Sequence, residues 1–231
     1  MIDLKKNQGR LDIQAVVFDM DGVITHTMPD HFRAWREILA AEGVHVSHHD
    51  IYSREGQRGI TSLQEIFSEK GVVYSRRTAQ RLLREKEELF KSISRQRFIP
   101  GARNFIRSLH RRGYRLGLVT GTSRHELHRI LPDALYKLFD VTVTGDEVGN
   151  GKPHPEPFIK ALRELAIDPR QAIVIENAPF GIAAAKAAGL KCLALETSLP
   201  RAYLQDADLV FESIRDLQAR IRFPGRRAGH A

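Results

Sequence analysis

The chain has 231 residues, of which 42% are hydrophobic and 28% are charged, which is typical of a soluble globular protein with one large domain, or one domain with an insert. Its net charge of +8 comes from short, separated basic runs without interleaved aromatic residues, so nucleic acid is not an expected partner. No apolar run approaches the roughly 20 residues that a membrane span requires. The single cysteine, Cys192, excludes an internal disulfide, and the N-terminal residues lack a secretory signal. We expect a monomer in the cytoplasm, although targeting by other means stays open.

Six short apolar runs are candidate strands. Most of them are continuous hydrophobic runs, as expected for parallel strands that are buried on both faces. In chain order they are Ala15–Asp19, Arg115–Thr120, Asp140–Gly145, Ala172–Glu176, Lys191–Glu196 and Asp208–Phe211. Helical patterns at 100–113, 154–167 and 180–189 lie between the later runs. This alternation predicts an α/β fold with a doubly wound, Rossmann-like parallel sheet.

One region interrupts the alternation. Residues 25–97 show only helical periodicity, in three stretches that begin near His31, Thr61 and Arg77. A helical block of this size between the first and second strands indicates an inserted cap domain. The core domain would then consist of residues 1–24 and 98–231. In the first helix of the block, one stripe of apolar side chains is expected to be core: Phe32, Trp35, Ile38 and Leu39.

The first candidate strand ends in two aspartates. In "VVFDMDGVITH", Asp19 and Asp21 are two residues apart, so in an extended chain their carboxylates point to the same side. Gly22 allows a sharp turn directly after them. Ligands of open α/β sheets bind beyond the carboxyl ends of the strands, which makes this end a candidate site. Taken alone, the pair is explained equally well as turn residues.

The ends of the following strands carry matching polar residues. After the second strand, Thr120 offers a hydroxyl group, and Gly121 and Thr122 offer backbone N–H groups near a helix start, which suits a phosphate oxygen. After the third strand, Lys152 lies between a glycine and a proline, which favours a fixed role over a solvated one. The fourth strand ends in Glu176 and Asn177, whose oxygens suit a hard cation such as Mg²⁺.

These motifs together resemble the haloacid dehalogenase (HAD) superfamily, and in particular its β-phosphoglucomutase-like phosphatases and phosphomutases with a helical cap after the first motif. The matching pieces are "DMDGVI", the "VTGTS" threonine, "GKPHPEPF" and "IENAPFGIAAAKAAG", in the family's order and spacing. The resemblance covers about residues 13–211. Four ordered motifs are far more specific than any one of them.

The resemblance implies a role for each of these residues. Asp19 would be the nucleophile that forms an aspartyl phosphate, and Asp21 would be the general acid and base. Thr120, Gly121 and Lys152 would hold the phosphate oxygens, and Lys152 would also offset the charge of Asp19. The implied cofactor is Mg²⁺. Its ligands would be Asp19, the backbone carbonyl of Asp21, and a side chain from the pair Glu176 and Asn177.

The fourth motif departs from the family pattern. Relatives usually have two acidic residues there, whereas this chain has Glu176 followed by Asn177. Asparagine keeps an oxygen ligand but removes one negative charge. We expect a working site with weaker Mg²⁺ affinity, in which Glu176 compensates in part. The alternative is a catalytically feeble relative.

The helical block suggests residues that contact the substrate. "HFRAWREIL" resembles the β-phosphoglucomutase group, in which His31 matches a histidine at the cap hinge and Lys86 matches a lysine that contacts the substrate. The arginine that grips a distal phosphate in the mutases is replaced here by Gly59, with Arg58 one residue earlier. A shift of one residue on a helix turns a side chain by about 100°, so whether Arg58 reaches the substrate is open. At the end of the second strand, Arg124 replaces a smaller polar residue of the mutases and is a further candidate for contact with the substrate, which leaves the sugar specificity open.

The leading hypothesis is a Mg²⁺-dependent phosphohydrolase that acts on a small phosphorylated metabolite such as a sugar phosphate. The nearest alternative is a β-phosphoglucomutase-like phosphotransferase, and a non-catalytic sensor of phosphorylated metabolites is a remote one. A dehalogenase is disfavoured because Asp21 belongs to phosphoryl chemistry. The cluster of His45, His48 and His49 lacks further ligands at metal-binding spacing, so no second metal site is expected there.

Overall fold

The computed structural model of the protein describes residues 13–225. Its centre is a six-stranded parallel sheet in the order β3-β2-β1-β4-β5-β6. The strands are β1 (Ala15–Phe18), β2 (Arg115–Val119), β3 (Val141–Val143), β4 (Ala172–Glu176), β5 (Lys191–Leu195) and β6 (Leu209–Phe211). All six predicted strands and the doubly wound α/β fold are confirmed.

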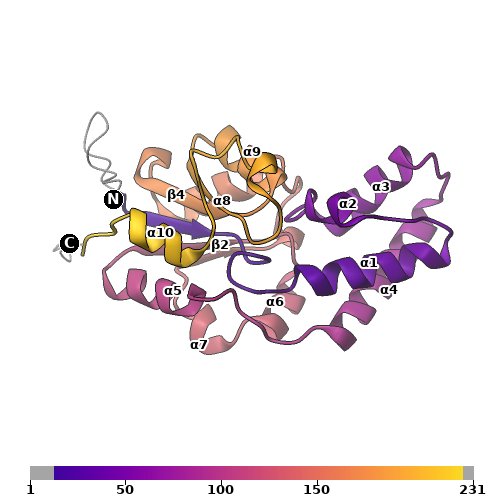
Figure 1. The fold of residues 1–231 in the computed structure, drawn as a ribbon, viewed down its shortest axis with the longest axis horizontal. Coiled ribbons are helices and arrows are strands. Elements are labelled where there is room, and N and C mark those ends of the chain that lie inside the picture. The colour runs from indigo at the N-terminus through magenta and orange to yellow at the C-terminus, as the bar shows by residue number, and fades with distance from the viewer. Residues whose placement is uncertain (1–12, 226–231) are drawn as a thin grey trace.

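Helices cover both faces of this sheet (Figure 1). Side chains alternate along each strand, so Val16 and Phe18 face one apolar cluster while Ala15 and Val17 face another. The first cluster includes side chains of α5 (Ala102–Arg111), α6 (Arg124–Ile130), α7 (Asp133–Tyr136) and α10 (Ile214–Arg220). The second includes α8 (Glu156–Leu165) and α9 (Pro179–Ala187). Two packed faces explain why the strands are apolar without interruption.

The remaining helices lie beyond one end of the sheet (Figure 1). They are α1 (Met28–Ala41), α2 (His48–Tyr52), α3 (Gly59–Glu69) and α4 (Arg76–Ile93), and they enclose an apolar cluster of their own. Phe32, Trp35 and Leu39 are buried in it and Ile38 packs against it, as the stripe on the first helix predicts. We call residues 25–97 the helical segment.

The chain enters and leaves the helical segment at adjacent points. Thr25 and Phe98 form an antiparallel bridge, and the His26 N–H donates to the carbonyl of Arg97 at 2.9 Å. The Arg97 guanidinium also donates to the Asp30 carboxylate at 2.6 Å. These crossings coincide with the domain boundaries expected from the sequence, although the division into two independent domains stays a prediction.

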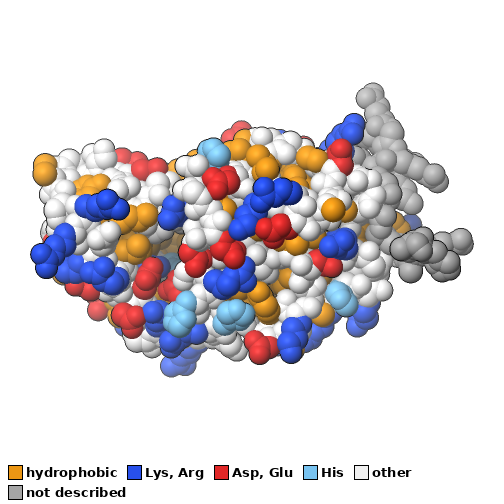
Figure 2. Space-filling view, turned by 180° about the vertical axis from the view of Figure 1, so that it is seen from behind, with side chains coloured by type: hydrophobic (Ala, Val, Ile, Leu, Met, Phe, Trp, Pro, Cys, Tyr) orange, Lys and Arg blue, Asp and Glu red, His pale blue; other side chains and the backbone are white. Residues whose placement is uncertain are grey.

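Several short helices have no counterpart in the predictions. They are α2, α7 and α10, which have between 4 and 7 residues, whereas α6 begins where a helix start was expected after Thr122. Two turns or fewer cannot display a helical period, so the sequence gives no pattern to detect. Within residues 13–225 no helix is both long and apolar enough to cross a membrane. On the face shown in Figure 2, basic and acidic side chains are interspersed.

Candidate active site

The two aspartates lie at the centre of the sheet edge. β1 is flanked by β2 and β4, and the order of the strands reverses between β1 and β4, which is where ligands of such sheets bind. The Asp19 N–H donates to the Ile175 carbonyl at 3.0 Å, so Asp19 still pairs with β4. The chain then turns at Gly22, whose φ of +85° is unfavourable for any other residue. Asp19 and Asp21 are thereby fixed by backbone geometry.

Lys152 joins the ends of three strands. Its ammonium donates to Oδ1 of Asp19 at 2.6 Å, to Oε1 of Glu176 at 2.7 Å and to the Val119 carbonyl at 3.2 Å. The side chains of Lys152, Asp19 and Glu176 are each only 1% exposed. The other oxygen of Glu176 accepts the N–H groups of Asn177 and Ala178, at 2.8 and 3.2 Å. Both Glu176 oxygens are therefore occupied, and this side chain positions Lys152.

Burial and the neighbouring charged groups set the pKa values of Asp19 and Lys152. Burial raises the pKa of Asp19 well above its usual value, and the carboxylates of Glu176 and Asp21 raise it further, whereas Lys152 opposes them. Burial alone would lower the pKa of Lys152, but the adjacent carboxylates of Asp19 and Glu176 raise it above its usual range. The lysine is thus charged at neutral pH, and it favours the ionised form of Asp19.

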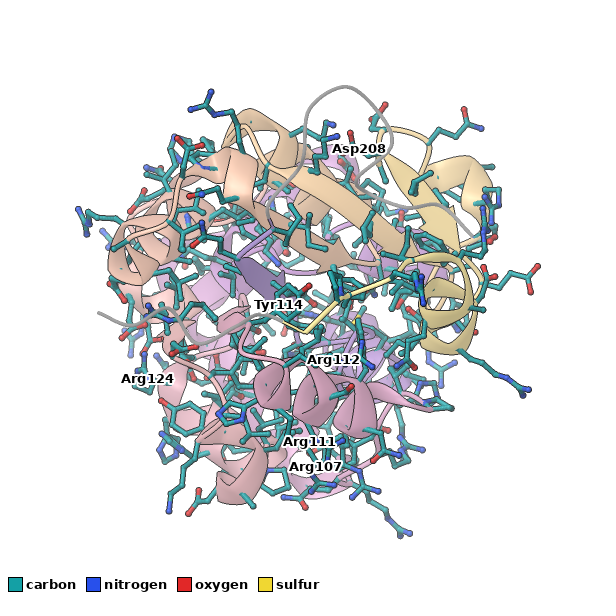
Figure 3. The ribbon with its side chains drawn as sticks, turned by 90° about the vertical axis from the view of Figure 1, so that its left-hand side faces the viewer. Arg107, Arg111, Arg112, Tyr114, Arg124 and Asp208 are labelled. Carbon is teal, nitrogen blue, oxygen red and sulfur yellow. The ribbon has the colours of Figure 1, made fainter. Side chains whose placement is uncertain are left out.

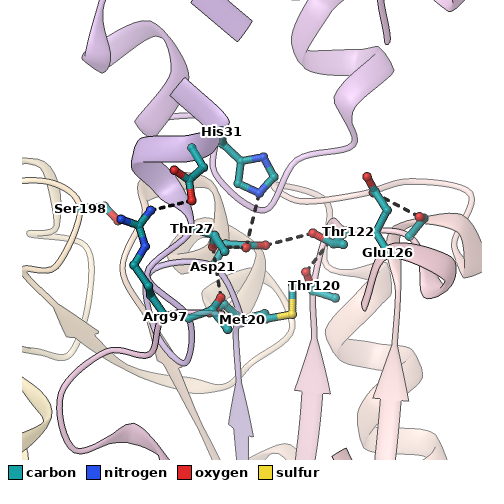
Figure 4. Close-up of polar contacts among 12 residues, drawn as sticks. Met20, Asp21, Thr27, His31, Arg97, Thr120, Thr122, Glu126 and Ser198 are labelled. Atoms are coloured by element: carbon teal, nitrogen blue, oxygen red, sulfur yellow. Dashed lines mark hydrogen bonds and ion pairs between the residues drawn. The ribbon is translucent and has the colours of Figure 1, made fainter. Parts of the chain in front are cut away.

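Asp21 is held by two threonine hydroxyls and a histidine (Figure 4). The Thr27 hydroxyl donates to its Oδ1 and the Thr122 hydroxyl to its Oδ2, the latter at 3.0 Å. His31 Nε2 lies 3.4 Å from Oδ1. Burial would raise the pKa of Asp21, but the hydrogen bond and the positive charge of protonated His31, together with the hydrogen bonds from Thr27 and Thr122, lower it to about 2. Asp21 is therefore a carboxylate in this arrangement and can accept a proton.

His31 connects Asp21 to Lys86. Lys86 Nζ lies 3.0 Å from Nδ1 of His31, whose ring stacks on Phe90 at a centroid distance of 4.0 Å. Burial and the neighbouring ammonium of Lys86 lower the pKa of His31, which favours the neutral ring. A neutral ring that accepts from Lys86 at Nδ1 carries its proton on Nε2, the atom that faces Asp21. The predicted residues His31 and Lys86 thus lie beside the aspartates.

The loop after β2 brings Thr120 and Gly121 to the same edge. The Thr120 hydroxyl accepts the N–H of Thr122 at 3.1 Å, and Thr120 is buried. A side chain on Gly121 would collide with the helical segment, because its Cβ would lie 2.6 Å from the carbonyl oxygen of Gly56. The backbone of the helical segment therefore lies directly on this loop. The structure brings the residues predicted to bind phosphate close to both aspartates.

Unpartnered oxygens mark a place that fits a divalent cation. Oδ2 of Asp19 and Oδ1 of Asn177 are buried and have no hydrogen-bond partner among the described residues. Oxygen atoms of carboxylates and amides are the ligands that Mg²⁺ takes. Within residues 13–225 no three His, Cys, Asp or Glu side chains form a ready metal-ligand group, so amide or backbone oxygens must contribute. The predicted ligand Glu176 offers no free oxygen, whereas Asn177 does.

The comparisons with known proteins agree with this geometry. The sequence model of the haloacid dehalogenase-like hydrolases matches residues 13–189. The chain belongs to this family. It is 33% identical to a phosphorylated carbohydrates phosphatase of Thermotoga maritima, over 78% of this chain and 83% of the relative. It is 30% identical to the β-phosphoglucomutase of Bacillus subtilis, over 89% of this chain and 92% of the relative. The superfamily and the enzyme predicted from the sequence are confirmed.

A solved structure shows the same likeness. The β-phosphoglucomutase from Clostridium difficile is 26% identical and superimposes with a TM-score of 0.78, and the match covers 89% of this chain and 93% of that one. Because the match covers nearly the whole of both chains, it includes the helical segment as well as the sheet. This HAD hydrolase therefore shares both parts of its architecture with the mutases.

A cavity of about 240 Å³ lies between the sheet edge and the helical segment. Asp21, His31, Lys86 and Thr122 line it, but Asp19 and Lys152 do not. Asp19 has 1% of its surface exposed, and Gly56 of the helical segment lies against Lys152, which binds Asp19. The HAD hydrolase is therefore in a closed arrangement.

The two arginines predicted to contact the substrate behave differently. Arg58 lines the cavity, but its guanidinium donates to the Gly149 carbonyl at 2.8 Å, which ties the helical segment to the loop that carries Lys152. Arg124 is not brought to the site, because its guanidinium is held by Glu147, Tyr136 and the Thr142 carbonyl at 2.8 to 3.0 Å. Figure 3 shows Arg124 at the edge of the core.

Three functional candidates were missed by sequence reasoning. The Thr27 hydroxyl binds Asp21. Glu126 lines the cavity with Oε1 unpartnered, and Glu55 is buried with both oxygens unpartnered. Glu126 follows the second strand by seven residues and Glu55 lies in the turn "REGQRG", so neither is part of a motif. Only the three-dimensional approach of the helical segment to the sheet reveals them.

Proposed function

We propose that this HAD hydrolase is a phosphatase that transfers a phosphoryl group from a small phosphorylated metabolite to Asp19 and then to water. The observation that carries the proposal is the Asp19 carboxylate, which Lys152 holds at 2.6 Å on one oxygen while the other has no partner. A carboxylate oriented by a fixed ammonium is a suitable nucleophile. The same ammonium would stabilise the charge on the transferring oxygens.

Asp21 is proposed as the proton carrier. Its pKa of about 2 makes it a base that can take a proton from the attacking water. To protonate the leaving oxygen it must first gain a proton, and an anionic phosphate bound nearby would raise its pKa, as like charges do. His31 could pass its Nε2 proton to Asp21 while Nδ1 takes a proton from the ammonium of Lys86, which lies 3.0 Å away.

The proposed cofactor is Mg²⁺, held by Asp19, Asn177 and the backbone carbonyl of Asp21. When bound, it supplies positive charge that neutralises the phosphoryl oxygens. Because Asn177 is neutral where relatives carry an acid, we expect weaker Mg²⁺ affinity than in those relatives. A titration of phosphatase activity tests this expectation, and saturation at low micromolar metal would contradict it.

A sugar phosphate is the proposed substrate class. Lys86 offers a cation to the cavity, and Glu126 offers a buried Oε1 without a partner, while its Oε2 accepts the Ser123 hydroxyl at 3.2 Å. Such acceptors suit hydroxyl groups of a sugar. The named activities of two relatives, a phosphorylated carbohydrates phosphatase and a β-phosphoglucomutase, support this class.

The second candidate is a phosphotransferase of the β-phosphoglucomutase type. The contact of His31 with Lys86 favours it, since both match residues of that group. Against it, Gly59 stands at the place of the arginine that grips a distal phosphate, and Arg58 is bound to the Gly149 carbonyl. Without that arginine, water is the better acceptor.

Two expectations about the whole molecule accompany this proposal. Residues 25–97 would act as a cap that opens for the substrate, since Asp19 is covered in the closed arrangement. The protein would be a monomer in the cytoplasm, which size-exclusion chromatography and cell fractionation test.

The decisive experiment is an assay with β-glucose 1-phosphate and a bisphosphate primer, followed by a panel of sugar phosphates, with and without Mg²⁺. Free phosphate supports the phosphatase, and isomerised sugar supports the mutase. Asp19→Asn must abolish either activity. If the wild-type protein released no phosphate from the panel and Asp19→Asn still bound the ligands equally well, a sensor would replace both proposals.

A further inference from the structure

Glu55 is an acid of the helical segment that reaches the catalytic edge of the sheet. It lies just before α3, and only 5% of it is exposed. Its Oε1 would be 2.8 Å from a Cβ built on Gly22, directly after Asp21. The same built Cβ would be 2.1 Å from Nδ2 of Asn177, so the amide of Asn177 lies at the same turn. Its Nδ2 donates to the Ser198 hydroxyl at 2.7 Å, which leaves Oδ1 as the atom open to a cation.

Negatively charged groups outnumber positively charged ones around Glu55. Four carboxylates meet at this edge, those of Asp19, Asp21, Glu55 and Glu176. Lys152 contacts two of them, since its ammonium is shared by Asp19 and Glu176. Both oxygens of Glu55 are buried without a hydrogen bond of ordinary length among the described residues, and the amide of Asn177 is the neighbouring donor that opposes the rise of its pKa on burial. A buried charge without a partner is unfavourable, so this arrangement calls for a further positive group.

Three residues at this edge of the sheet have unpartnered oxygens that suit a cation. They are Oδ2 of Asp19, Oδ1 of Asn177 and both oxygens of Glu55. We propose that Glu55 is a ligand of the divalent cation and supplies the negative charge that Asn177 lacks. This inference rests on the proposed cation-dependent function and adds a ligand from the helical segment to it. Two carboxylates and an amide form a set of oxygen ligands that suits Mg²⁺ or Mn²⁺.

A ligand on the helical segment couples cation binding to closure. The backbone around Glu55 is held on the sheet by two contacts, the approach of the Gly56 carbonyl to Gly121 and the hydrogen bond from Arg58 to Gly149. Movement of the segment away from the sheet would withdraw Glu55 from Asp19 and Asn177. The cation therefore binds more tightly in the closed arrangement, and it favours that arrangement in return.

The test is calorimetric titration of metal-free protein with Mn²⁺ and with Mg²⁺, without substrate. Glu55→Gln keeps the shape of the side chain and removes its charge, so we expect the Kd to rise about tenfold or more. Asn177→Asp restores the acid in the fourth motif and should lower the Kd. In the Asn177→Asp background the effect of Glu55→Gln should shrink to about threefold or less, because the two charges serve one cation.

Thermal unfolding gives a second readout that does not depend on activity. Without metal, Glu55→Gln should unfold at a higher temperature than wild type, because an uncompensated buried charge is removed. With Mg²⁺, the wild-type midpoint should rise more than that of the variant. The matched control is Glu37→Gln, an exposed acid on α1 in the same segment, which should change neither the Kd nor the response to metal.

The outcomes separate the possible failures. Equal Kd values for wild type and Glu55→Gln overturn the role of Glu55 and leave the proposed phosphatase intact. Tighter binding of inorganic phosphate by Glu55→Gln at unchanged metal affinity also overturns it, since Glu55 would then occupy the phosphate position. If the wild-type protein binds neither metal, the proposed cation site itself is wrong.

Discussion

The ammonium of Lys152 lies 2.6 Å from Oδ1 of Asp19, and neither side chain has more than 1% of its surface exposed. The two residues are 133 positions apart in the chain, and Glu176 at 2.7 Å shares the same ammonium. This contact ties the loop after β3 to the end of β1. It gives Lys152 a structural role in addition to its proposed role in phosphoryl transfer.

Lys152→Met should therefore lower both stability and activity. It leaves the carboxylates of Asp19 and Glu176 buried without a cation, which costs about 3–5 kcal/mol of unfolding free energy. The loss should be smaller at pH 5 than at pH 7.5, because the carboxyl groups can then take up protons. Urea unfolding at both pH values measures it. The control is Lys191→Met, which changes an exposed lysine of β5, and an equal loss in both variants would contradict the prediction.

Asp21 should make the free energy of unfolding depend on pH in the acid range. Its pKa is about 2 in the folded protein and about 3.9 in an unfolded chain. The lowered pKa means that Asp21 stabilises the fold above about pH 4, and that this contribution is lost as the pH falls toward 2. Its full size is about 2–3 kcal/mol. The difference in unfolding free energy between wild type and Asp21→Asn should therefore shrink between pH 5 and pH 3.

The control for this titration is Asp206→Asn, which changes an exposed acid. Its difference from wild type should stay nearly constant over the same interval. A constant difference for Asp21→Asn as well would mean that Thr27, Thr122 and His31 do not favour the ionised carboxylate of Asp21.

Arg124→Ala should reduce stability but spare catalysis. The substitution removes the hydrogen bonds of the guanidinium to Glu147, Tyr136 and Thr142, which together are worth about 1–3 kcal/mol of unfolding free energy. The value of kcat/KM for a sugar phosphate should stay within about twofold of wild type, because Arg124 does not line the cavity. Arg170→Ala, at an exposed ion pair, is the control and should change stability by about 0.5 kcal/mol or less. A large fall in kcat/KM at unchanged stability would restore Arg124 as a substrate residue.

The sheet and its catalytic edge could be predicted because they depend on local patterns. Buried parallel strands are continuous apolar runs, and the polar residues that follow Phe18, Val119 and Glu176 must meet at one edge. The direction of a side chain in a loop has no such pattern. Arg124 turns to Glu147 because that acid lies beside it in space, and Glu176 turns to Lys152 for the same reason.

Contacts between the helical segment and the sheet could not be predicted from the sequence. Glu55 meets Asn177 across 122 positions only because the segment closes over β1 and β4. Nothing in the spacing of "REGQRG" indicates which residue of that turn points inward. The close approach at Gly56 has the same origin.

Gly56→Ala provides the sharpest test of the closed arrangement. Gly56 has a φ of +77°, and a Cβ there would lie 2.7 Å from Cδ of Lys152. Gly43 has a φ of +75° but nothing within 4 Å of its Cβ. Both alanine variants should lose about 1–2 kcal/mol of unfolding free energy through backbone strain. Only Gly56→Ala should also lose activity, because it must displace Lys152 or hold the helical segment off the sheet. Equal kcat/KM values for the two variants would show that closure over Lys152 is not needed for turnover.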